Sequence, residues 1–269
     1  SSGRTARLHL KVDSGMHRLG IHPGDATDFI RRMKEMGGIE VAGLMSHLAQ
    51  ADEEEGGPAT EAQLGVIRAL EGDLRSKGLL PPVVHVSNSA GALNYPETLG
   101  GLMRMGIALY GCPPAHAVDV GLRPAMSLKS EIIQVMDVPG GEAVGYGGTY
   151  RRSGAGRIAV VPIGYADGYP RLLSNRADVL VGGLRAPVAG RVSMDMITVD
   201  VSEAEGAGEG DEVVLIGAQG DERIACEELA SRSHTITYEI MSRVGLRVPR
   251  LYYRDGRAVS GRILGGGKD

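Results

Sequence analysis

The feature that most constrains this chain is a change of rhythm after residue 110. Before that point β-type runs alternate with helical ones: strands are expected at 8–13, 39–47, 83–87 and 102–111, and helices at 24–36, 60–78 and 89–99. Strands joined by helical crossovers run parallel, so this half predicts a parallel sheet with helices packed against it. After Pro113 and Pro114, short β-type runs separated by glycine turns are typical of an all-β domain, with one helix at 222–232. The sequence therefore predicts two domains, 1–118 and 119–269.

Composition narrows the class of protein. Hydrophobic residues make up 42% of the 269 residues and the formal net charge is −4, which describes a folded, mildly acidic protein. The absence of Trp, the single Phe and the lack of a basic excess argue against nucleic-acid binding. The apolar runs are far too short to span a bilayer, and the first ten residues contain no signal-peptide core. Cys112 and Cys226 are the only cysteines, so a disulfide scaffold is excluded and a cytoplasmic location is expected.

Polar residues lie where the predicted parallel strands end. His47 ends the second strand, Asn88 and Ser89 follow the third, and Arg104 lies within the apolar fourth. Sites of parallel α/β proteins form at this edge, where Ser89 and the N–H groups of its helix could hold a phosphate. The alternatives stay open here: Ser89 can be a helix N-cap alone, and His47 a satisfied histidine. Arg104 must meet a carboxylate, a ligand or solvent, because an unpaired buried arginine is costly.

Two further stretches carry candidate residues. In HLKVD, Lys11 most simply pairs with Asp13 or points outward. In VVPIGYADGYPR, the apolar run from Val160 to Ile163 leads into a turn with two tyrosines, an aspartate and an arginine. Hairpin ends rarely carry two tyrosines and a paired charge, so this turn calls for a functional explanation.

Eight motifs in register resemble those of bacterial alanine racemase. They are KVDSGMHRLG, SHLAQAD, HVSNSAG, RMGIALYG, GYGGTY, PIGYADGYPR, GRVSMD and RVPR. PIGYADGYPR is the most specific of them, whereas GYGGTY contains a generic glycine turn. The resemblance covers essentially the whole chain. It implies a metal-free, pyridoxal-phosphate-dependent enzyme with an N-terminal TIM barrel and a C-terminal β domain, working as a head-to-tail homodimer with shared active sites. The implied reaction interconverts L-alanine and D-alanine, which supplies D-alanine for cell-wall peptidoglycan.

The resemblance also assigns catalytic and cofactor roles. The catalytic tyrosine falls on Tyr146, its histidine partner on His47, and the arginine that faces the pyridine nitrogen on Arg104. Contacts to the cofactor phosphate fall on Ser89, Gly106 and Ile107, with Asn88 beside them.

Substrate and access roles follow in the same way. Arg18 falls near the cofactor phenolate and the substrate carboxylate, Met194 falls on the substrate-carboxylate loop, and Lys11, often carbamylated in the family, supports Arg18. The corridor to the cofactor falls on Asp52, Tyr165, Arg171 and Arg191. Tyr165 and Arg171 thus explain the turn in VVPIGYADGYPR, in which Asp167 and Tyr169 are left as turn and packing residues.

These residue types suit racemisation. A proton must leave Cα on one face and return on the other, so two bases are required. Tyrosine, with a pKa of about 10, is a poor base unless nearby positive charge lowers its pKa, for which His47 and the surroundings of Arg104 are candidates. A guanidinium keeps its proton, so Arg104 would leave the ring nitrogen unprotonated and disfavour side reactions such as transamination.

The other base of the family is absent from the sequence. The Schiff-base lysine lies in a motif like AVVKANAYGHG, and the lysines of this chain, at 11, 34, 77, 129 and 268, lack that context. The first half also has only about four strand–helix units, roughly half of a closed barrel. We therefore expect the chain to hold the C-terminal portion of the barrel, with the lysine on a missing or separate N-terminal segment, so that the chain alone is inactive. Leu246 stands where the family often has a phosphate-contacting tyrosine.

Two other functions stay open. One is a broad-specificity amino-acid racemase of the same fold, which the pocket walls near Met194 and Tyr165 would decide. The other is a non-catalytic cofactor-binding fragment, which would not co-purify with a lysine-bearing chain.

Overall fold

The chain divides into two compact units, Ser1–Arg123 and Pro124–Asp269. The computed structural model describes residues 4–98 and 100–263. The division lies between residues 123 and 124, whereas the sequence-based boundary lies between 118 and 119. Among the described residues, no helix is both long and apolar enough to cross a membrane.

The first unit is built on a parallel sheet, as the strand–helix alternation predicts. Its three strands have the order β1-β2-β3, and both pairings are parallel. The elements are β1 (Ala6–Lys11), η1 (Pro23–Asp25), α1 (Ala26–Glu35), β2 (Ile39–Met45), α2 (Gly57–Ser76), β3 (Val83–His85), α3 (Ser89–Asn94), η2 (Pro96–Thr98) and η3 (Ile107–Tyr110).

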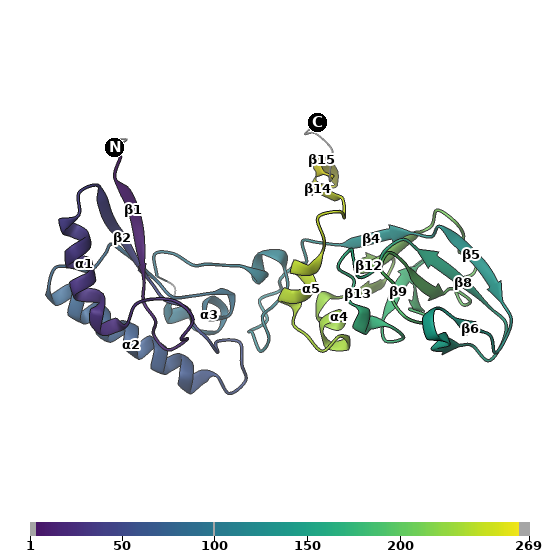
Figure 1. The fold of residues 1–269 in the computed structure, drawn as a ribbon, viewed down its shortest axis with the longest axis horizontal. Helices are drawn as coiled ribbons and strands as arrows, with labels where there is room; N and C mark the ends of the chain where they lie inside the picture. The colour runs from purple at the N-terminus through teal and green to yellow at the C-terminus, as the bar shows by residue number, and fades with distance from the viewer. Residues whose placement is uncertain (1–3, 99, 264–269) are drawn as a thin grey trace. The chain divides into compact units, whose positions relative to one another are not determined.

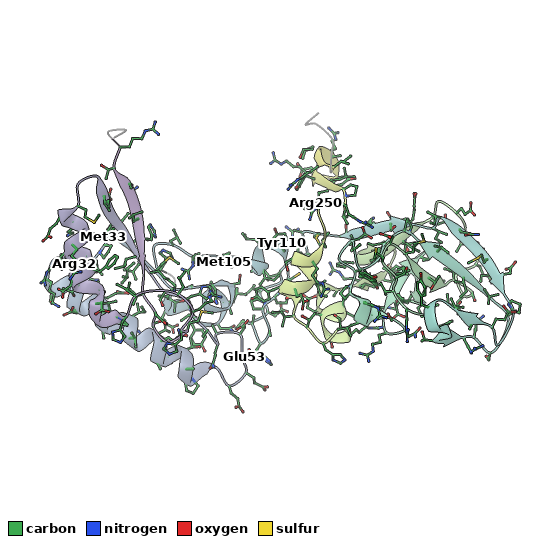
Figure 2. The ribbon with its side chains drawn as sticks, in the orientation of Figure 1. Arg32, Met33, Glu53, Met105, Tyr110 and Arg250 are labelled. Atoms are coloured by element: carbon green, nitrogen blue, oxygen red, sulfur yellow. The ribbon has the colours of Figure 1, made fainter. Side chains whose placement is uncertain are left out.

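The two longer helices, α1 and α2, pack on the same side of this sheet (Figure 1). Ile30 of α1 and Leu74 of α2 meet Leu44 of β2 in one buried cluster, while Arg32 of α1 is exposed (Figure 2). Leu10 of β1 and the following Val12 face this cluster, and because side chains alternate along a strand, His9 and Lys11 face the other side of the sheet. That second side carries the polar groups described below.

The expected fourth strand at 102–111 is wrong. Residues 102–106 are irregular, and Ile107–Tyr110 form the 3₁₀-helix η3. The Arg104 amide donates to the Ser87 carbonyl at 3.1 Å, and one such bond does not make a ladder. Apolar composition alone therefore misassigned this stretch. Composition does not show that Gly106 has a backbone conformation (φ −114°, ψ −92°) outside the strand region.

The second unit is antiparallel, as its short strands and glycine turns predict. One sheet has the order β10-β9-β12-β13 with β4 paired to β12, another has the order β11-β8-β5, and β6-β7 and β14-β15 are hairpins. The elements are β4 (Leu128–Glu131), β5 (Gln134–Val138), β6 (Ala143–Val144), η4 (Tyr146–Gly148), β7 (Tyr150–Arg151), β8 (Gly156–Val161), η5 (Arg171–Leu173), β9 (Asp178–Val181), β10 (Leu184–Pro187), β11 (Ile197–Asp200), β12 (Glu212–Gln219), β13 (Glu222–Ile224), α4 (Cys226–Arg232), α5 (Thr237–Arg243), β14 (Arg250–Arg254) and β15 (Arg257–Arg262).

Local sequence explains the tight turns of this unit. Gly182 and Gly183 join β9 to β10, and both have positive φ values, 60° and 81°, which a two-residue type I′ turn requires. The single helix expected at 222–232 is in part a strand: β13 occupies its first three residues, and α4 begins only at Cys226.

Candidate functional site

The centre of the first unit's polar side is the guanidinium of Arg104. Its Nη1 lies 2.5 Å from Nδ1 of His85 and 3.3 Å from the His85 carbonyl oxygen. Its Nη2 donates to the carbonyl oxygens of Ser46 (2.7 Å) and Val86 (3.0 Å) and lies 3.2 Å from Nδ1 of His47. Arg104, His47 and His85 are called the Arg104 cluster below. Carbonyl and imidazole acceptors therefore satisfy an arginine that the sequence predicted to need a carboxylate, a ligand or solvent.

The cluster fixes the protonation of its two histidines. Burial first, and then the charge of Arg104, lower the pKa of His47 to about 4 and that of His85 to about 4. Both rings are thus neutral at neutral pH. A guanidinium only donates, so each Nδ1 presents its lone pair to Arg104 and the ring proton lies on Nε2 in each. Asn88 Nδ2 lies farther away, 3.5 Å from His47 Nε2, and donates to the Leu48 carbonyl instead. His47 is therefore not the positive charge that was expected beside the tyrosine, and Arg104 carries that charge.

His85 extends the cluster across the sheet. Its Nε2 lies 2.8 Å from Nδ1 of His9, and since Nε2 holds the proton, His85 donates to His9. Gly43 makes room for this contact, because a Cβ atom there would lie 2.6 Å from the His9 Nδ1. The hydrogen bonds thus point one way: Arg104 donates to His85, and His85 donates to His9.

One donor of Arg104 remains. Among residues 4–98 and 100–263, the Nε–H has no hydrogen-bond acceptor, although both terminal nitrogens are bonded. The Nε–H is therefore the group of Arg104 that can bind a ligand without breaking the cluster.

The predicted phosphate residues lie together at the start of α3. Asn88 is the N-cap: its Oδ1 accepts from the Gly91 amide at 2.9 Å, and its Nδ2 donates to the Leu48 carbonyl at 3.1 Å. The alternative that Ser89 is only the N-cap is therefore wrong. Ser89 Oγ accepts from the amides of Gly106 (2.9 Å) and Ala108 (3.4 Å), so its hydroxyl proton is still available to donate. This brings Asn88, Ser89, Gly106 and Ile107 into one locality.

Lys11 ends β1, and the loop that follows places Arg18. Asp13 Oδ1 accepts from the amides of Gly15, Met16 and His17 at 2.9–3.0 Å, which holds the loop that leads to the exposed Arg18. Lys11 does not pair with Asp13 as expected, and its Nζ lies 3.4 Å from the Val12 carbonyl oxygen. Burial first, and then Arg104, lower the pKa of Lys11, which favours the neutral amine that carbamylation requires.

Asp52 also belongs to this unit. It is half-buried, and its charge opposes part of the lowering of the His47 pKa, which shows that it lies within electrostatic range of the Arg104 cluster.

Tyr146 lies in the second unit, in a glycine turn between β6 and β7. Gly145 and Gly147 have φ values of 72° and 73°, so the turn needs glycine on both sides of the tyrosine. Tyr146 itself is 72% exposed. A Cβ atom at Gly147 would lie 3.1 Å from the Arg191 guanidinium, so Arg191 packs against the turn that carries Tyr146.

The turn at 164–171 joins the loop that carries Met194. The Tyr165 and Ala166 amides donate to the carbonyl oxygens of Ser193 (3.1 Å) and Met194 (3.0 Å). The side chains of Tyr165 and Met194 are both exposed at this junction. Among the described residues the Met194 amide donates no hydrogen bond, which leaves it free for a carboxylate.

The remaining polar residues of this turn have structural roles. Tyr169 is buried, and Asp167 accepts from the Gly164 amide at 2.8 Å and pairs with Arg247 at 2.6 Å. Arg171 begins η5 and is exposed. Asp167 and Tyr169 thus fit the turn and packing roles predicted for them.

Gly164 is expected to tolerate no side chain, because a Cβ atom there would overlap the carbonyl oxygens of Ser193 and Met194. Gly164→Ala should therefore lower the free energy of unfolding by roughly 1–3 kcal/mol, measured by urea denaturation of the full chain. Gly154→Ala is the matched control, because a Cβ atom there meets nothing within 4 Å. Equal unfolding midpoints for the two variants would contradict this packing.

Sequence reasoning missed two residues that organise the site. His85 lies in HVSNSAG and Arg247 lies in RVPR, and the family resemblance assigns neither of them a role. Arg247 bridges Asp167 (2.6 Å) and Asp195 (2.5 Å), and so ties the 164–171 turn to the Met194 loop. The sequence did contain a signal for His85: it lies two residues before the Ser–Asn–Ser run at the end of the strand. The alternation of side chains along that strand places it on the polar side of the sheet.

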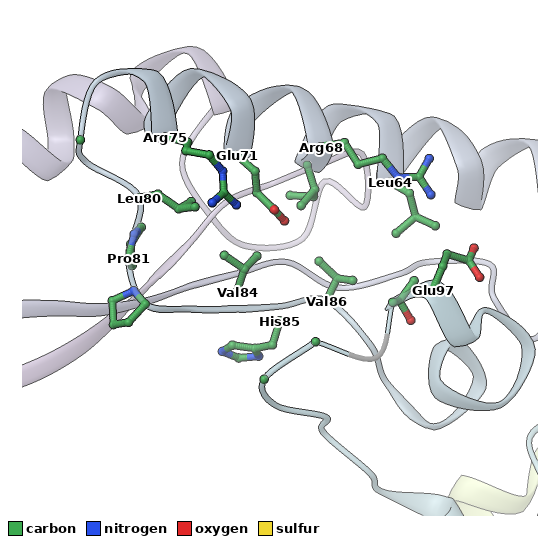
Figure 3. Close-up of a pocket in the computed structure, with 16 residues that line it drawn as sticks. Leu64, Arg68, Glu71, Arg75, Leu80, Pro81, Val84, His85, Val86 and Glu97 are labelled. Carbon is green, nitrogen blue, oxygen red and sulfur yellow. The ribbon is translucent and has the colours of Figure 1, made fainter.

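A separate cavity of about 710 Å³ lies between α2 and β3. Figure 3 shows Val84 and Val86 on the side of β3 that faces α2, with His85 on the other side. His85 is the member of the Arg104 cluster that lines this cavity, and the other lining residues are mainly those of α2 and of 80–86. The candidate site is therefore not this cavity. Among the described residues, no group of three or more His, Cys, Asp or Glu side chains could hold a metal ion.

The candidate residues thus fall into two sets, one on each unit. The first unit holds Lys11, Arg18, His47, Asp52, Asn88, Ser89, Arg104, Gly106 and Ile107, and the second holds Tyr146, Tyr165, Arg171, Arg191 and Met194.

Both units match known sequence families. Residues 1–114 match the alanine racemase N-terminal domain, and residues 125–252 match the alanine racemase C-terminal domain. The curated alanine racemase of Syntrophobacter fumaroxidans is 47% identical over 247 residues, which are 91% of this chain and 65% of that protein. That of Symbiobacterium thermophilum is 45% identical over 252 residues, 93% of this chain and 67% of that protein. The chain therefore spans about two thirds of the length of these relatives.

Solved structures agree. The alanine racemase of Bacillus anthracis, solved with bound L-Ala-P, has a TM-score of 0.86 at 35% identity and covers 96% of this chain and 67% of its own. The enzyme of the D-cycloserine producer Streptomyces lavendulae has a TM-score of 0.86 at 40% identity and covers 94% and 67%. With both domain families matched in order and the fold shared with these structures, the chain belongs to the alanine racemase family.

Proposed function

We propose that this chain forms the cofactor-binding and β-domain part of an alanine racemase. In this proposal it acts with an N-terminal segment that bears the Schiff-base lysine, and it interconverts L-alanine and D-alanine to supply D-alanine for peptidoglycan. The observation that carries the proposal is the Arg104 cluster: a guanidinium fixed between two neutral histidines, with one donor left, in a chain 47% identical to a curated alanine racemase.

The residues present fit pyridoxal phosphate. The free Nε–H of Arg104 is a donor for an unprotonated pyridine nitrogen. The Ser89 hydroxyl and the Ile107 amide would hold the phosphate, with Gly106 beside them, whose own amide donates to Ser89 Oγ, and Arg18 would face the phenolate side. When bound, the cofactor withdraws electrons from Cα and so makes its proton acidic. Arg104 keeps its proton at every physiological pH, so it would donate a hydrogen bond to the ring nitrogen without transferring a proton to it.

Tyr146 would serve one face of the substrate. In the proposed homodimer, Tyr146 of one subunit meets the Arg104 cluster of the other. His47 is neutral with its proton on Nε2, so it would donate that N–H to the tyrosine oxygen rather than take its proton. Donation to the phenolate, together with the nearby charge of Arg104, favours the ionised tyrosine that can act as a base. Met194 would bind the substrate carboxylate through its free amide.

The chain expressed alone is expected to be inactive in alanine racemisation, because one of the two bases is absent from the sequence and because, within residues 4–98 and 100–263, β1 and β3 are unpaired edges of the parallel sheet. Adding a lysine-bearing N-terminal barrel segment from a related alanine racemase should restore activity above background. The measurement is conversion of L-alanine to D-alanine by chiral chromatography, with the same segment carrying Lys→Ala as the control.

Two results would contradict the proposal. Racemisation by residues 1–269 alone would remove the need for the second segment. A complemented enzyme that binds pyridoxal phosphate but racemises serine or lysine at least as well as alanine would favour the broad-specificity racemase instead.

A further inference from the structure

The buried side chain of Gln63 joins two loops of the candidate site. Gln63 lies on the apolar face of α2 and is 4% exposed. Its Oε1 accepts from the Ala49 amide at 2.9 Å, and its Nε2 donates to the His47 carbonyl oxygen at 3.1 Å and to Ser14 Oγ at 3.2 Å. An amide N–H can only donate and a carbonyl oxygen can only accept, so these partners fix which end of the Gln63 amide is which.

A chain of hydroxyl groups continues from Gln63 to β1. Ser46 Oγ donates to the Val12 carbonyl oxygen at 2.9 Å, and this uses its single proton. Ser14 Oγ lies 2.7 Å from Ser46 Oγ and must therefore be the donor in that bond. Ser14 then has only lone pairs to offer Gln63, so Gln63 has to donate to it. Ser14, Ser46 and Gln63 are all buried, and water does not substitute readily for any of these bonds.

The partners of Gln63 belong to different loops. Ser14 lies in the loop after β1 that leads to Arg18, whereas His47 and Ala49 lie in the loop after β2. The same second loop supplies the Ser46 carbonyl and the His47 ring that hold Arg104. Gln63 is thus the point on α2 where the backbone of His47 and the approach to Arg18 are tied together.

We infer that Gln63 is a positioning residue of the proposed racemase: it sets the distance between His47, the partner of Tyr146, and Arg18, the substrate-side arginine. This inference rests on the proposed function for its kinetic consequence. Gln63 itself acts through these two residues and touches neither cofactor nor substrate in the proposal. A purely apolar role is excluded by the bonding, because a hydrocarbon of the same shape would leave the Ala49 amide and the His47 carbonyl without the partner that Gln63 provides, and Ser14 Oγ with its Ser46 bond alone.

Gln63→Glu is the sharpest test, because it changes the side chain's donors and keeps its shape. An ionised carboxylate still accepts from the Ala49 amide but cannot donate to His47 or Ser14. Burial raises the pKa of the introduced carboxyl, and below that pKa the neutral acid regains one donor. The defect should therefore be relieved as the pH falls, whereas the parent enzyme shows no such relief.

The experiment compares four forms of the complemented enzyme: parent, Gln63→Glu, Gln63→Met and Thr60→Val. Thr60 is the matched control, since it lies one turn earlier on α2, is fully buried, and its hydroxyl has no partner among the described residues. We expect kcat/KM for alanine to fall by about 10- to 100-fold in Gln63→Met and in Gln63→Glu at pH 8, and to recover in part for Gln63→Glu at pH 6. Thr60→Val should keep the parent value at both pH values.

A second readout needs no activity. In the 269-residue chain, the Ala49 amide should exchange with deuterium faster in Gln63→Met than in the parent or in Thr60→Val, because its acceptor has been removed. Unchanged Ala49 exchange, or a folded Gln63→Glu enzyme with parent kcat/KM and no change in its pH profile, would overturn the inference. A parent enzyme that does not racemise alanine, with Ala49 exchange behaving as expected, would instead overturn the proposed function and leave the link between the loops standing.

Discussion

Arg104→Glu is expected to slow alanine racemisation by about 100-fold or more in the complemented enzyme and to raise pyruvate formation. A carboxylate opposite the pyridine nitrogen would favour protonation of that nitrogen and make the ring a stronger electron sink. Stronger withdrawal would open the route to transamination, in which the amino group of alanine would pass to the cofactor and pyruvate would be released, once per active site. The parent guanidinium cannot support this, because it has no proton to share at physiological pH.

Because Arg104 donates all the hydrogen bonds that join the Arg104 cluster, the first control is whether this variant folds. The new carboxylate would face three carbonyl oxygens, those of Ser46, His85 and Val86, where the guanidinium now donates. Arg104→Lys retains the positive charge with fewer donors, and it should lose racemase activity without gaining pyruvate formation. Both variants are compared by urea denaturation and by pyridoxal phosphate binding before their kinetics are measured.

The contrary outcome is specific. If Arg104→Glu is folded and binds the cofactor, yet forms no more pyruvate than the parent, Arg104 braces the ends of β2 and β3 and does not face the ring nitrogen. The assignment of the other cofactor contacts, Ser89, Gly106 and Ile107, would then have to be rebuilt.

Tyr146→Phe should abolish proton transfer on one face of alanine while the cofactor stays bound. General-base catalysis by a positioned side chain contributes about 10²- to 10⁴-fold, so we expect Cα deuterium exchange to fall by about 10³-fold with one enantiomer and by far less with the other. The measurement is exchange of L-alanine and D-alanine in deuterium oxide, followed separately by NMR. The 72% exposure of Tyr146 and the glycines beside it make a folding defect from this change small.

Tyr253→Phe is the control for removing an exposed tyrosine hydroxyl, since Tyr253 is 63% exposed on β14. It should leave exchange of both enantiomers unchanged. Equal slowing of the two enantiomers by Tyr146→Phe would mean that Tyr146 is not a base for one face.

The sequence predicted what depends on local pattern. Strand–helix alternation identified the parallel sheet, and the helix expected at 60–78 corresponds to α2, Gly57–Ser76. The same apolar pattern misassigned 102–111, because a strand needs a neighbour and composition does not supply one. Gln63 lies within the predicted helix, but its partners at 14, 47 and 49 are distant in sequence and could not be read from the helical pattern.

Long-range bonds account for the rest of the site. Nothing local in HVSNSAG distinguishes the cap, Asn88, from Ser89, whose hydroxyl is taken by an amide 17 positions later. The charge state of His47 is equally non-local, because it follows from an arginine 57 positions away. Motif resemblance located these residues, and their hydrogen-bond directions required the fold.

The five bonds that hold Arg104 also bear on how tightly a ligand can bind there. An arginine side chain carries about 2 kcal/mol of rotamer entropy, and ordering it during binding would subtract that amount from the affinity. Here the strand-end carbonyls and the two imidazoles already order the guanidinium. The rotamer entropy of Arg104 is therefore lost when the chain folds and not when a ligand binds. A ligand that meets the Nε–H is spared a factor of roughly thirty in its dissociation constant. By ordering Arg104 before a ligand arrives, His47 and His85 thus strengthen ligand binding, in addition to their effect on protonation.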